Sequence, residues 1–137
     1  MDEPINLVLF SGTDDKLQAA AVLTAGAAAL GKPVNIFLQY WALDAFRADR
    51  IGADHGLAPE AGSAGRAAVD DLAAAGQASW AETLRLAKEL GGVDIQACSL
   101  SMDLLKLESG DLDPLVDGVE GVTSFYLNAG EGQLVFI

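Results

Sequence analysis

Short, mainly apolar runs along the chain predict five strands. Residues 5–10 read INLVLF, an uninterrupted apolar run that is typical of a strand buried on both faces. VNIFLQYW at 34–41 and VDIQAC at 93–98 predict the second and third strands. VTSFYLN at 122–128 and QLVFI at 133–137 are predicted as the fourth and fifth.

A helical pattern follows the first strand. Alanine and leucine are dense over residues 16–30, and Gly31 and then Pro33 end the pattern as expected at a helix terminus. Ser11 or Thr13 is the expected N-cap of this helix.

A second clear helix precedes the third strand. Trp80, Leu84, Ala87 and Leu90 fall on one face of the pattern, and two glycines close it. Ser79 is the expected N-cap.

The remaining segments have weaker patterns. ALDAFRADR at 42–50 and SMDLLKLES at 101–109 predict short helices, and RAAVDDLAAAG at 66–76 predicts a helix with weak packing. IGADHGLAPEAGSAG at 51–65 holds little bulky apolar material, so it is predicted as a mobile loop or lid.

Strands that alternate with helices predict right-handed βαβ units. The expected fold is a three-layer α/β/α sandwich with a mostly parallel sheet of about five strands, and the 137 residues are expected to form a single domain over 1–137. Ligands of such folds collect beyond the carboxyl ends of the strands. The rule selects Ser11–Asp14, Gln39–Ala42, Cys98–Ser101 and Asn128–Gly130.

Composition and charge exclude several classes of function. The chain is 51% hydrophobic and carries a net charge of −12, so it lacks the clustered cations that bind nucleic acid or an anionic membrane. No apolar run is long enough for a membrane helix, and the acidic start MDEPIN does not resemble a signal peptide, so a cytoplasmic protein is expected. Acidic residues are dense between Ser101 and Glu120, either as a solvated surface or as a docking rim beside Cys98.

Neither metal nor nucleotide chemistry has support in the sequence. One cysteine and one histidine, His55, form no metal-binding cluster, and neither a dinucleotide fingerprint nor a Walker motif occurs, so no cofactor is expected. Asp14 and Asp15 are interpreted as acids that complement the dipole of a helix start. His55 is given no catalytic role.

Cys98 is the candidate reactive residue. It ends a predicted strand and begins a predicted helix, where helix N–H groups favour the thiolate, and Ser99 and Ser101 are placed to add hydrogen bonds. Asp103 would compete for the same positive helix end. A free cysteine is also often a buried filler, and the apolar neighbours of Cys98 permit that interpretation too.

The segment VDIQACSLSMDLLKL at 93–107 resembles the branch of the DsrE/DsrF-like family whose hallmark reads A-C-x-x-S-M-D. LVLFSGTDDKLQAA, VNIFLQYWAL and DLDPLVDGVEGVTSFYLNAG also resemble that family, whereas residues 47–78 do not. Cys98, Ser101, Met102 and Asp103 match the hallmark.

The resemblance implies a sulfur carrier that holds sulfane sulfur as a persulfide on Cys98. It also implies a homo-oligomer, a trimer or another small assembly, and partners that are TusA-like and rhodanese-like sulfur-transfer proteins. Ser11, Tyr40 and Trp41 lie at neighbouring predicted strand ends, where they either line the pocket of the thiol or pack in the core or a subunit interface.

Two alternatives remain at this point. One is a binding or scaffolding module in which the cysteine is inert. The other is a thiol peroxidase, although no Thr/Arg arrangement that would polarise a peroxide surrounds Cys98 in the sequence.

Overall fold

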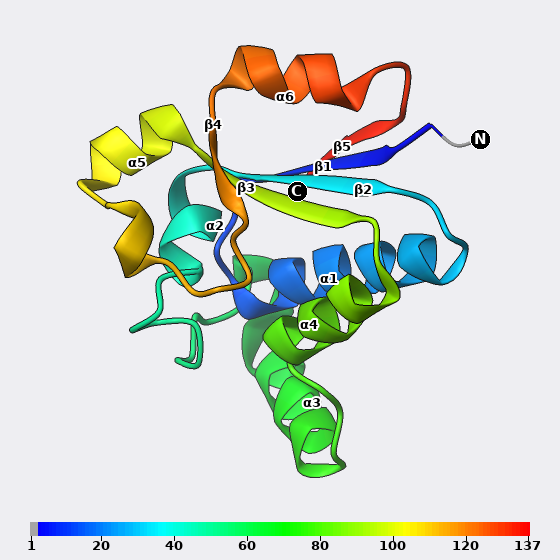
Figure 1. The fold of residues 1–137 in the computed structure, drawn as a ribbon. Helices are drawn as coiled ribbons and strands as arrows, with labels where there is room; N and C mark the ends of the chain where they lie inside the picture. The colour runs from blue at the N-terminus through cyan, green and yellow to red at the C-terminus, as the bar shows by residue number, and fades with distance from the viewer. Residues whose placement is uncertain (1–2) are drawn as a thin grey trace.

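Five parallel strands form one sheet in the computed structural model, which describes residues 3–137 (Figure 1). The strands are β1 (Ile5–Leu9), β2 (Val34–Leu38), β3 (Val93–Cys98), β4 (Gly118–Glu120) and β5 (Leu134–Phe136). Their order across the sheet is β4-β3-β2-β1-β5, and every neighbouring pair is parallel. The predicted α/β sandwich with a five-stranded parallel sheet is confirmed.

Helices cover both faces of this sheet. They are α1 (Asp14–Ala29), α2 (Tyr40–Ala45), α3 (Gly62–Ala74), α4 (Trp80–Leu90), α5 (Ser99–Leu105) and α6 (Val122–Ala129), with 3₁₀ turns η1 (Pro59–Ala61) and η2 (Ser109–Asp111). In Figure 1, α1 and α4 lie side by side on one face, and α6 lies across the other. The first helix and the α4 helix were both predicted from their apolar patterns.

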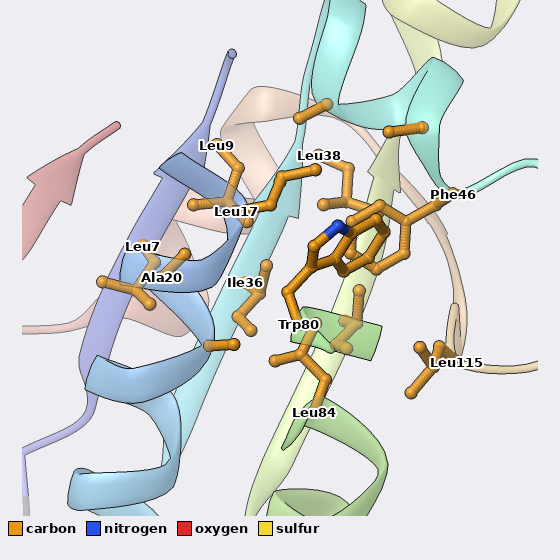
Figure 2. Close-up of a cluster of buried hydrophobic side chains, with 14 of the residues drawn as sticks. Leu7, Leu9, Leu17, Ala20, Ile36, Leu38, Phe46, Trp80, Leu84 and Leu115 are labelled. Atoms are coloured by element: carbon orange, nitrogen blue, oxygen red, sulfur yellow. The ribbon is translucent and has the colours of Figure 1, made fainter. Parts of the chain in front are cut away.

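The main core lies between the sheet and the α1/α4 layer (Figure 2). Leu7, Leu9, Ile36 and Leu38 project from β1 and β2 into this layer, and Trp80 packs among them from the first turn of α4. All five side chains are at most 5% exposed. Burial of side chains of this size contributes roughly 1.5–3 kcal/mol each, so this layer supplies much of the stability.

A smaller cluster lies on the opposite face, under α6. Val8, Phe37, Cys98 and Phe125 form it, and the rings of Phe37 and Phe125 stack with centroids 4.8 Å apart. Successive strand residues point to opposite faces, so Val8 enters this cluster while its neighbours enter the main core. The side chain of Cys98 therefore faces α6.

The prediction of a strand at 122–128 is wrong. These residues form α6, and the short β4 pairs with β3 at the edge of the sheet instead. Phe125 and Ala129, four positions apart, are the buried residues of this helix. That spacing belongs to one face of a helix, and a short apolar run is ambiguous between helix and strand until its partners are known.

Two boundaries also differ from the predictions. The second strand ends at Leu38, and α2 begins at Tyr40, whose backbone has a φ of 45°. The predicted loop over 51–65 includes η1 and the first turn of α3. Helix α3 itself was predicted with weak packing, and it has no buried residue.

Helices α1 and α4 both begin at a predicted N-cap residue, but a side-chain cap bond forms at only one of them. Ser79 accepts the N–H of Glu82 at 3.1 Å, and the Glu82 carboxylate accepts the N–H of Ser79 at 3.0 Å, so the predicted N-cap is confirmed as a capping box. Thr13 occupies the N-cap position of α1 without a side-chain cap bond, and Ser11 lies outside the helix. Leu90, predicted on the buried face of α4, is 63% exposed.

Candidate functional site

The carboxyl ends of β1, β2 and β3 meet at one edge of the sheet, as a parallel sheet requires. The rings of Phe10 and Tyr40 are 4.9 Å apart, which joins the ends of β1 and β2. The backbone N–H of Tyr40 donates to the Ser101 hydroxyl at 3.0 Å, which joins the ends of β2 and β3. The predicted groups around Ser11, Tyr40 and Cys98 therefore lie along the same edge.

The predicted group Asn128–Gly130 lies elsewhere. Because 122–128 is helical, this group follows α6 and comes before β5, at the amino edge of the sheet. The Asn6 side chain donates to the carbonyl of Ala129 at 3.2 Å, and the Asn35 side chain donates to the carbonyl of Asn128 at 3.2 Å. The two asparagines satisfy carbonyls at the end of α6, which the prediction of a strand there did not anticipate.

Cys98 occupies the N-cap position of α5, with extended φ and ψ of −71° and 121°. The strand-to-helix junction predicted from the sequence is therefore present. The side chain is only 5% exposed and packs with Val8, Phe37 and Phe125. The thiol is therefore almost entirely shielded from the solvent in this conformation.

The hallmark residues after Cys98 have different surroundings. Ser101 is 1% exposed, and its hydroxyl accepts the N–H of Tyr40, so it fixes the start of α2. Met102 is buried in the main core, on the other side of the sheet from the thiol cluster. Ser99 and Asp103 are exposed. The Ser101 hydroxyl thus binds the backbone of Tyr40, and the Met102 side chain belongs to the main core and not to the cluster around Cys98.

The aromatic residues at the end of β2 divide into a packed and an exposed one. Tyr40 is half-buried against Phe10, whereas Trp41 is 55% exposed. The Ser11 hydroxyl lies 3.3 Å from that of Thr13. Ser11 and Tyr40 therefore make local contacts at the edge, and Trp41 presents an aromatic surface to the solvent.

Glu120 is a direct neighbour of Cys98, a pairing that the sequence did not predict although Glu120 ends the acidic stretch considered as a rim beside the thiol. The two residues are register partners on β4 and β3, so their side chains leave the same face of the sheet. The Glu120 carboxylate accepts the side-chain N–H of Asn128 at 3.2 Å. Burial and then the nearby charge of Asp94 raise the pKa of Glu120, against the lowering effect of the Asn128 bond. No sequence pattern predicts this pairing, because it depends on the three-residue edge strand β4.

The acidic stretch between Ser101 and Glu120 is largely structural. Asp111 accepts the backbone N–H of Glu108 at 2.8 Å, and Asp113 accepts that of Leu115 at 2.9 Å. Asp117 accepts the N–H of Ile95 on β3, also at 2.8 Å. These carboxylates hold the segment that leads into β4.

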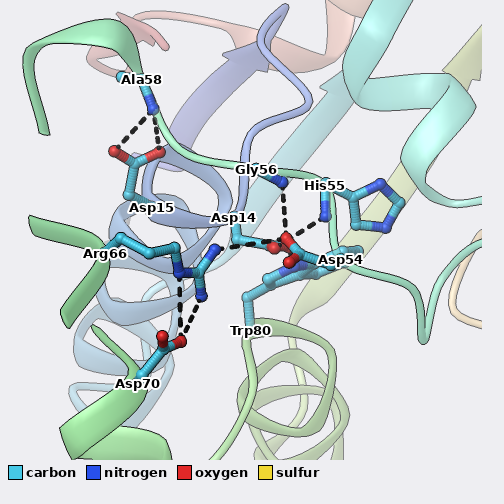
Figure 3. Close-up of polar contacts among 9 residues, drawn as sticks. All are labelled: Asp14, Asp15, Asp54, His55, Gly56, Ala58, Arg66, Asp70 and Trp80. Atoms are coloured by element: carbon cyan, nitrogen blue, oxygen red, sulfur yellow. Dashed lines mark hydrogen bonds and ion pairs between the residues drawn. The ribbon is translucent and has the colours of Figure 1, made fainter. Parts of the chain in front are cut away.

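Asp14 connects three segments of the chain (Figure 3). One carboxylate oxygen accepts the backbone N–H of His55 at 2.9 Å, and the other accepts the indole N–H of Trp80 at 2.9 Å. Asp14 therefore fixes the 51–65 segment and the start of α4 to the start of α1. The sequence assigned it to the helix dipole alone.

Asp15 binds the 51–65 segment at Ala58, three residues after His55. Both of its oxygens accept the N–H of Ala58 at 3.1 Å. Burial raises the pKa of Asp15, but hydrogen bonds from the Thr13 side chain and from the N–H groups of Ala58 and Lys16 outweigh it, and the pKa lies below its usual value. The predicted loop is thus tied to α1 at two positions.

Among residues 3–137, no group of three or more His, Cys, Asp and Glu side chains is arranged to hold a metal ion. Within the same residues, no helix has both the length and the apolar character needed to cross a membrane.

Comparison with known proteins identifies the family. The model of the DsrE/DsrF/DrsH-like family matches residues 1–56. The uncharacterized protein YrkE of Bacillus subtilis is 30% identical over 149 residues, covering 93% of this chain and 92% of YrkE. The chain belongs to the DsrE/DsrF/DrsH-like family. At the level of the family, this supports a role in sulfur relay together with sulfur-relay partners.

Solved structures share the fold. The ychN protein of E. coli is 12% identical, with a TM-score of 0.62 and coverage of 100% of both chains. MTH1491 of Methanobacterium thermoautotrophicum, a protein of unknown function, is 15% identical, with a TM-score of 0.53 and coverage of 99% of this chain and 100% of that one. At these identities the likeness concerns the fold alone.

Proposed function

We propose that the protein is a sulfur carrier or sulfurtransferase that holds sulfane sulfur as a persulfide on Cys98. The family and the position of Cys98 at the junction of β3 and α5 support the proposal. The thiolate is the reactive form of cysteine, and a helix start favours it. The junction is the observation that carries the proposal.

The chemistry needs one thiol and no change in overall oxidation state. The Cys98 thiolate attacks the outer sulfur of a donor, a new S–S bond forms on Cys98, and the donor leaves with the electron pair of its broken bond: sulfite from thiosulfate, or a thiolate from a persulfide. A thiolate of the acceptor then attacks the outer sulfur and releases the Cys98 thiolate. Because Cys98 is the only cysteine, no second thiol of the chain discharges the persulfide as a disulfide.

We infer that the thiol becomes accessible when α6, which contributes Phe125 to the cluster around Cys98, moves. Phe125 and Ala129 are the residues that α6 buries, while Val122, Tyr126 and Leu127 on the same helix are 50–79% exposed. Few apolar contacts hold this helix to the sheet, and local opening is easiest where such contacts are few. Displacement of Phe125 exposes the sulfur and makes room for a second one.

Intact-mass analysis tests the proposal directly. The protein is exposed to thiosulfate, polysulfide or a persulfidated TusA-like or rhodanese-like protein, with Cys98→Ser as the control. The expected result is the addition of one sulfur atom that a thiol reductant removes and that Cys98→Ser lacks. An unmodified Cys98 after treatment with every donor contradicts the proposal.

Phe125 supplies a second test. Phe125→Leu keeps an apolar side chain but removes an aromatic ring from the cluster around Cys98, so the rate of alkylation by iodoacetamide is expected to rise several-fold. Phe46→Leu is the matched control, because Phe46 is equally buried in the core on the other face. Equal alkylation rates in the two variants, measured under conditions where both are folded, would show that Phe125 does not limit access.

The proposal extends to the surroundings of the protein. It places the chain in the cytoplasm as a homo-oligomer, a trimer or another small assembly, that exchanges sulfur with TusA-like or rhodanese-like proteins. Sedimentation measures the assembly. Transfer of labelled sulfur from such a donor to the wild type, but not to Cys98→Ser, measures the exchange.

The burial of Cys98 favours one other function. A thiol that is 5% exposed among three apolar side chains is also what a core filler looks like, and the protein would then be a binding or scaffolding subunit. Cys98→Ala separates the two functions. It leaves complex formation and activity in vivo intact if the protein is a scaffold, and it abolishes sulfur transfer if the protein is a carrier.

A further inference from the structure

A cavity of about 540 Å³ lies between α1, α3 and α4, away from the thiol. Residues of the first turns of α1 and α4, the inner side of α3 and residues 51–53 line it. Cys98 faces α6 on the opposite side of the sheet and does not line this cavity. The volume falls in the range of small-molecule sites, roughly 300–1,000 Å³.

The wall that α3 contributes is apolar and is not fully buried by any other part of residues 3–137. Val69, Leu72 and Ala73 of this helix all line the cavity, but α3 buries no residue, and Leu72 is 53% exposed. Trp80 and Ala81 at the start of α4 also line it, although they are only 5% and 6% exposed. The apolar stripe of α3 thus faces a space where an apolar molecule would remove it from water.

The charges around the cavity favour a cation. Asp14, Asp15 and Glu82 line it with one cation, Arg85, and Arg66 of α3, whose charge also acts on Asp14, is paired with Asp54 and Asp70. The guanidinium of Arg85 lies 3.4 Å from the carboxylate of Asp113, which takes up part of its charge. The whole chain carries a net charge of −12, so an anion entering this cavity would be repelled.

The two aspartates are also fixed in place. The bonds of Asp14 to His55 and Trp80, and those of Asp15 to Ala58, hold both carboxylates in place (Figure 3), and both residues line the cavity. Each bond uses one lone pair, and an ionised carboxylate offers about four such sites, so acceptor capacity remains. Carboxylates that are already positioned lose little freedom when they bind a cation.

We propose that this cavity binds an apolar molecule that carries one cationic group. The cation lies at Asp14 and Asp15, and the apolar body lies between Leu72 and Trp80. This site is independent of the sulfur chemistry proposed for Cys98, and Cys98→Ser leaves it unchanged.

Trp80 is a built-in probe of this site. The chain has two tryptophans, so Trp41→Phe leaves Trp80 as the only one. Decylammonium, decanol and decanoate are titrated below their micelle concentrations while the emission of Trp80 is recorded. Calorimetry on the unmodified protein provides a second measurement that needs no substitution.

Decylammonium is expected to give a saturable change and to bind at least ~10-fold more tightly than decanoate, with decanol between them, and added salt is expected to reduce this difference. Leu72→Ala is expected to weaken decylammonium binding by about fivefold or more. Leu86→Ala is the control, because Leu86 is 59% exposed on α4 and does not line the cavity.

Several results would overturn the proposal. These are the absence of saturable binding by both methods, decanoate binding as tight as that of decylammonium, and equal effects of Leu72→Ala and Leu86→Ala. Each result is independent of whether Cys98 accepts sulfur, so failure here and failure of the sulfur-carrier function are distinguishable.

Discussion

Replacement of Asp14 by alanine distinguishes the role seen in the structure from the role assigned by the sequence. An acid that only complements a helix dipole contributes about 0.3–1 kcal/mol. The Asp14 carboxylate instead accepts two hydrogen bonds at 2.9 Å, from His55 and from the indole of Trp80. A hydrogen bond to a charged group contributes about 1.5–3 kcal/mol, so Asp14→Ala is expected to lower the free energy of unfolding by about 3 kcal/mol.

Urea denaturation followed by far-UV circular dichroism measures this loss. A double-mutant cycle with Trp80→Phe isolates the indole bond, because Trp80→Phe removes the N–H donor and the cycle cancels the change in packing. A coupling of about 1 kcal/mol or more is expected. A loss below about 1 kcal/mol for Asp14→Ala that salt largely removes would refute the reasoning and leave only the dipole interaction.

Two further substitutions test the packing and the charges near the site. Gly12→Ala places a Cβ against the carbonyl of Trp41 and is expected to lower the free energy of unfolding by about 1–3 kcal/mol. Gly26→Ala, in open space within α1, is expected to raise it by about 0.5–1 kcal/mol. Equal effects of the two substitutions in thermal unfolding would contradict this contrast. The raised pKa of Glu120 means that its ionised form destabilises the fold, so Glu120→Gln is expected to raise the melting temperature at neutral pH. This gain should shrink as the pH falls through the folded pKa towards the ordinary value of 4.5, and a gain that does not depend on pH would exclude the explanation.

The meeting of the carboxyl ends of β1, β2 and β3 at one edge of the sheet was predictable, because it follows from the common direction of parallel strands. In a parallel sheet every strand ends at the same edge, so the ends of the first three strands had to meet once those strands were recognised. The contacts between Phe10 and Tyr40, and between Tyr40 and Ser101, confirm this. The position of Cys98 at a junction of strand and helix needed only the local pattern.

The error at 122–128 shows where local pattern is insufficient. VTSFYLN has strand-forming residues, and its helical face of Phe125 and Ala129 is visible only when the sheet under it is known. The strand beside β3 at the edge of the sheet is instead β4, whose three residues are too few to show the alternation of apolar and polar residues that marks a strand. The direct pairing of Glu120 with Cys98 was therefore not predicted.

The sequence by itself determined the α/β class, the first three strands, the two long helices that cover one face and the place of the only cysteine at a strand end. These features depend on local composition and on the repeat of apolar residues. The tertiary structure alone decided that Phe125 packs in one cluster with the thiol and that Asp14 joins residues 41 and 66 positions away. Such contacts depend on how distant segments pack, and no local pattern in the chain encodes them.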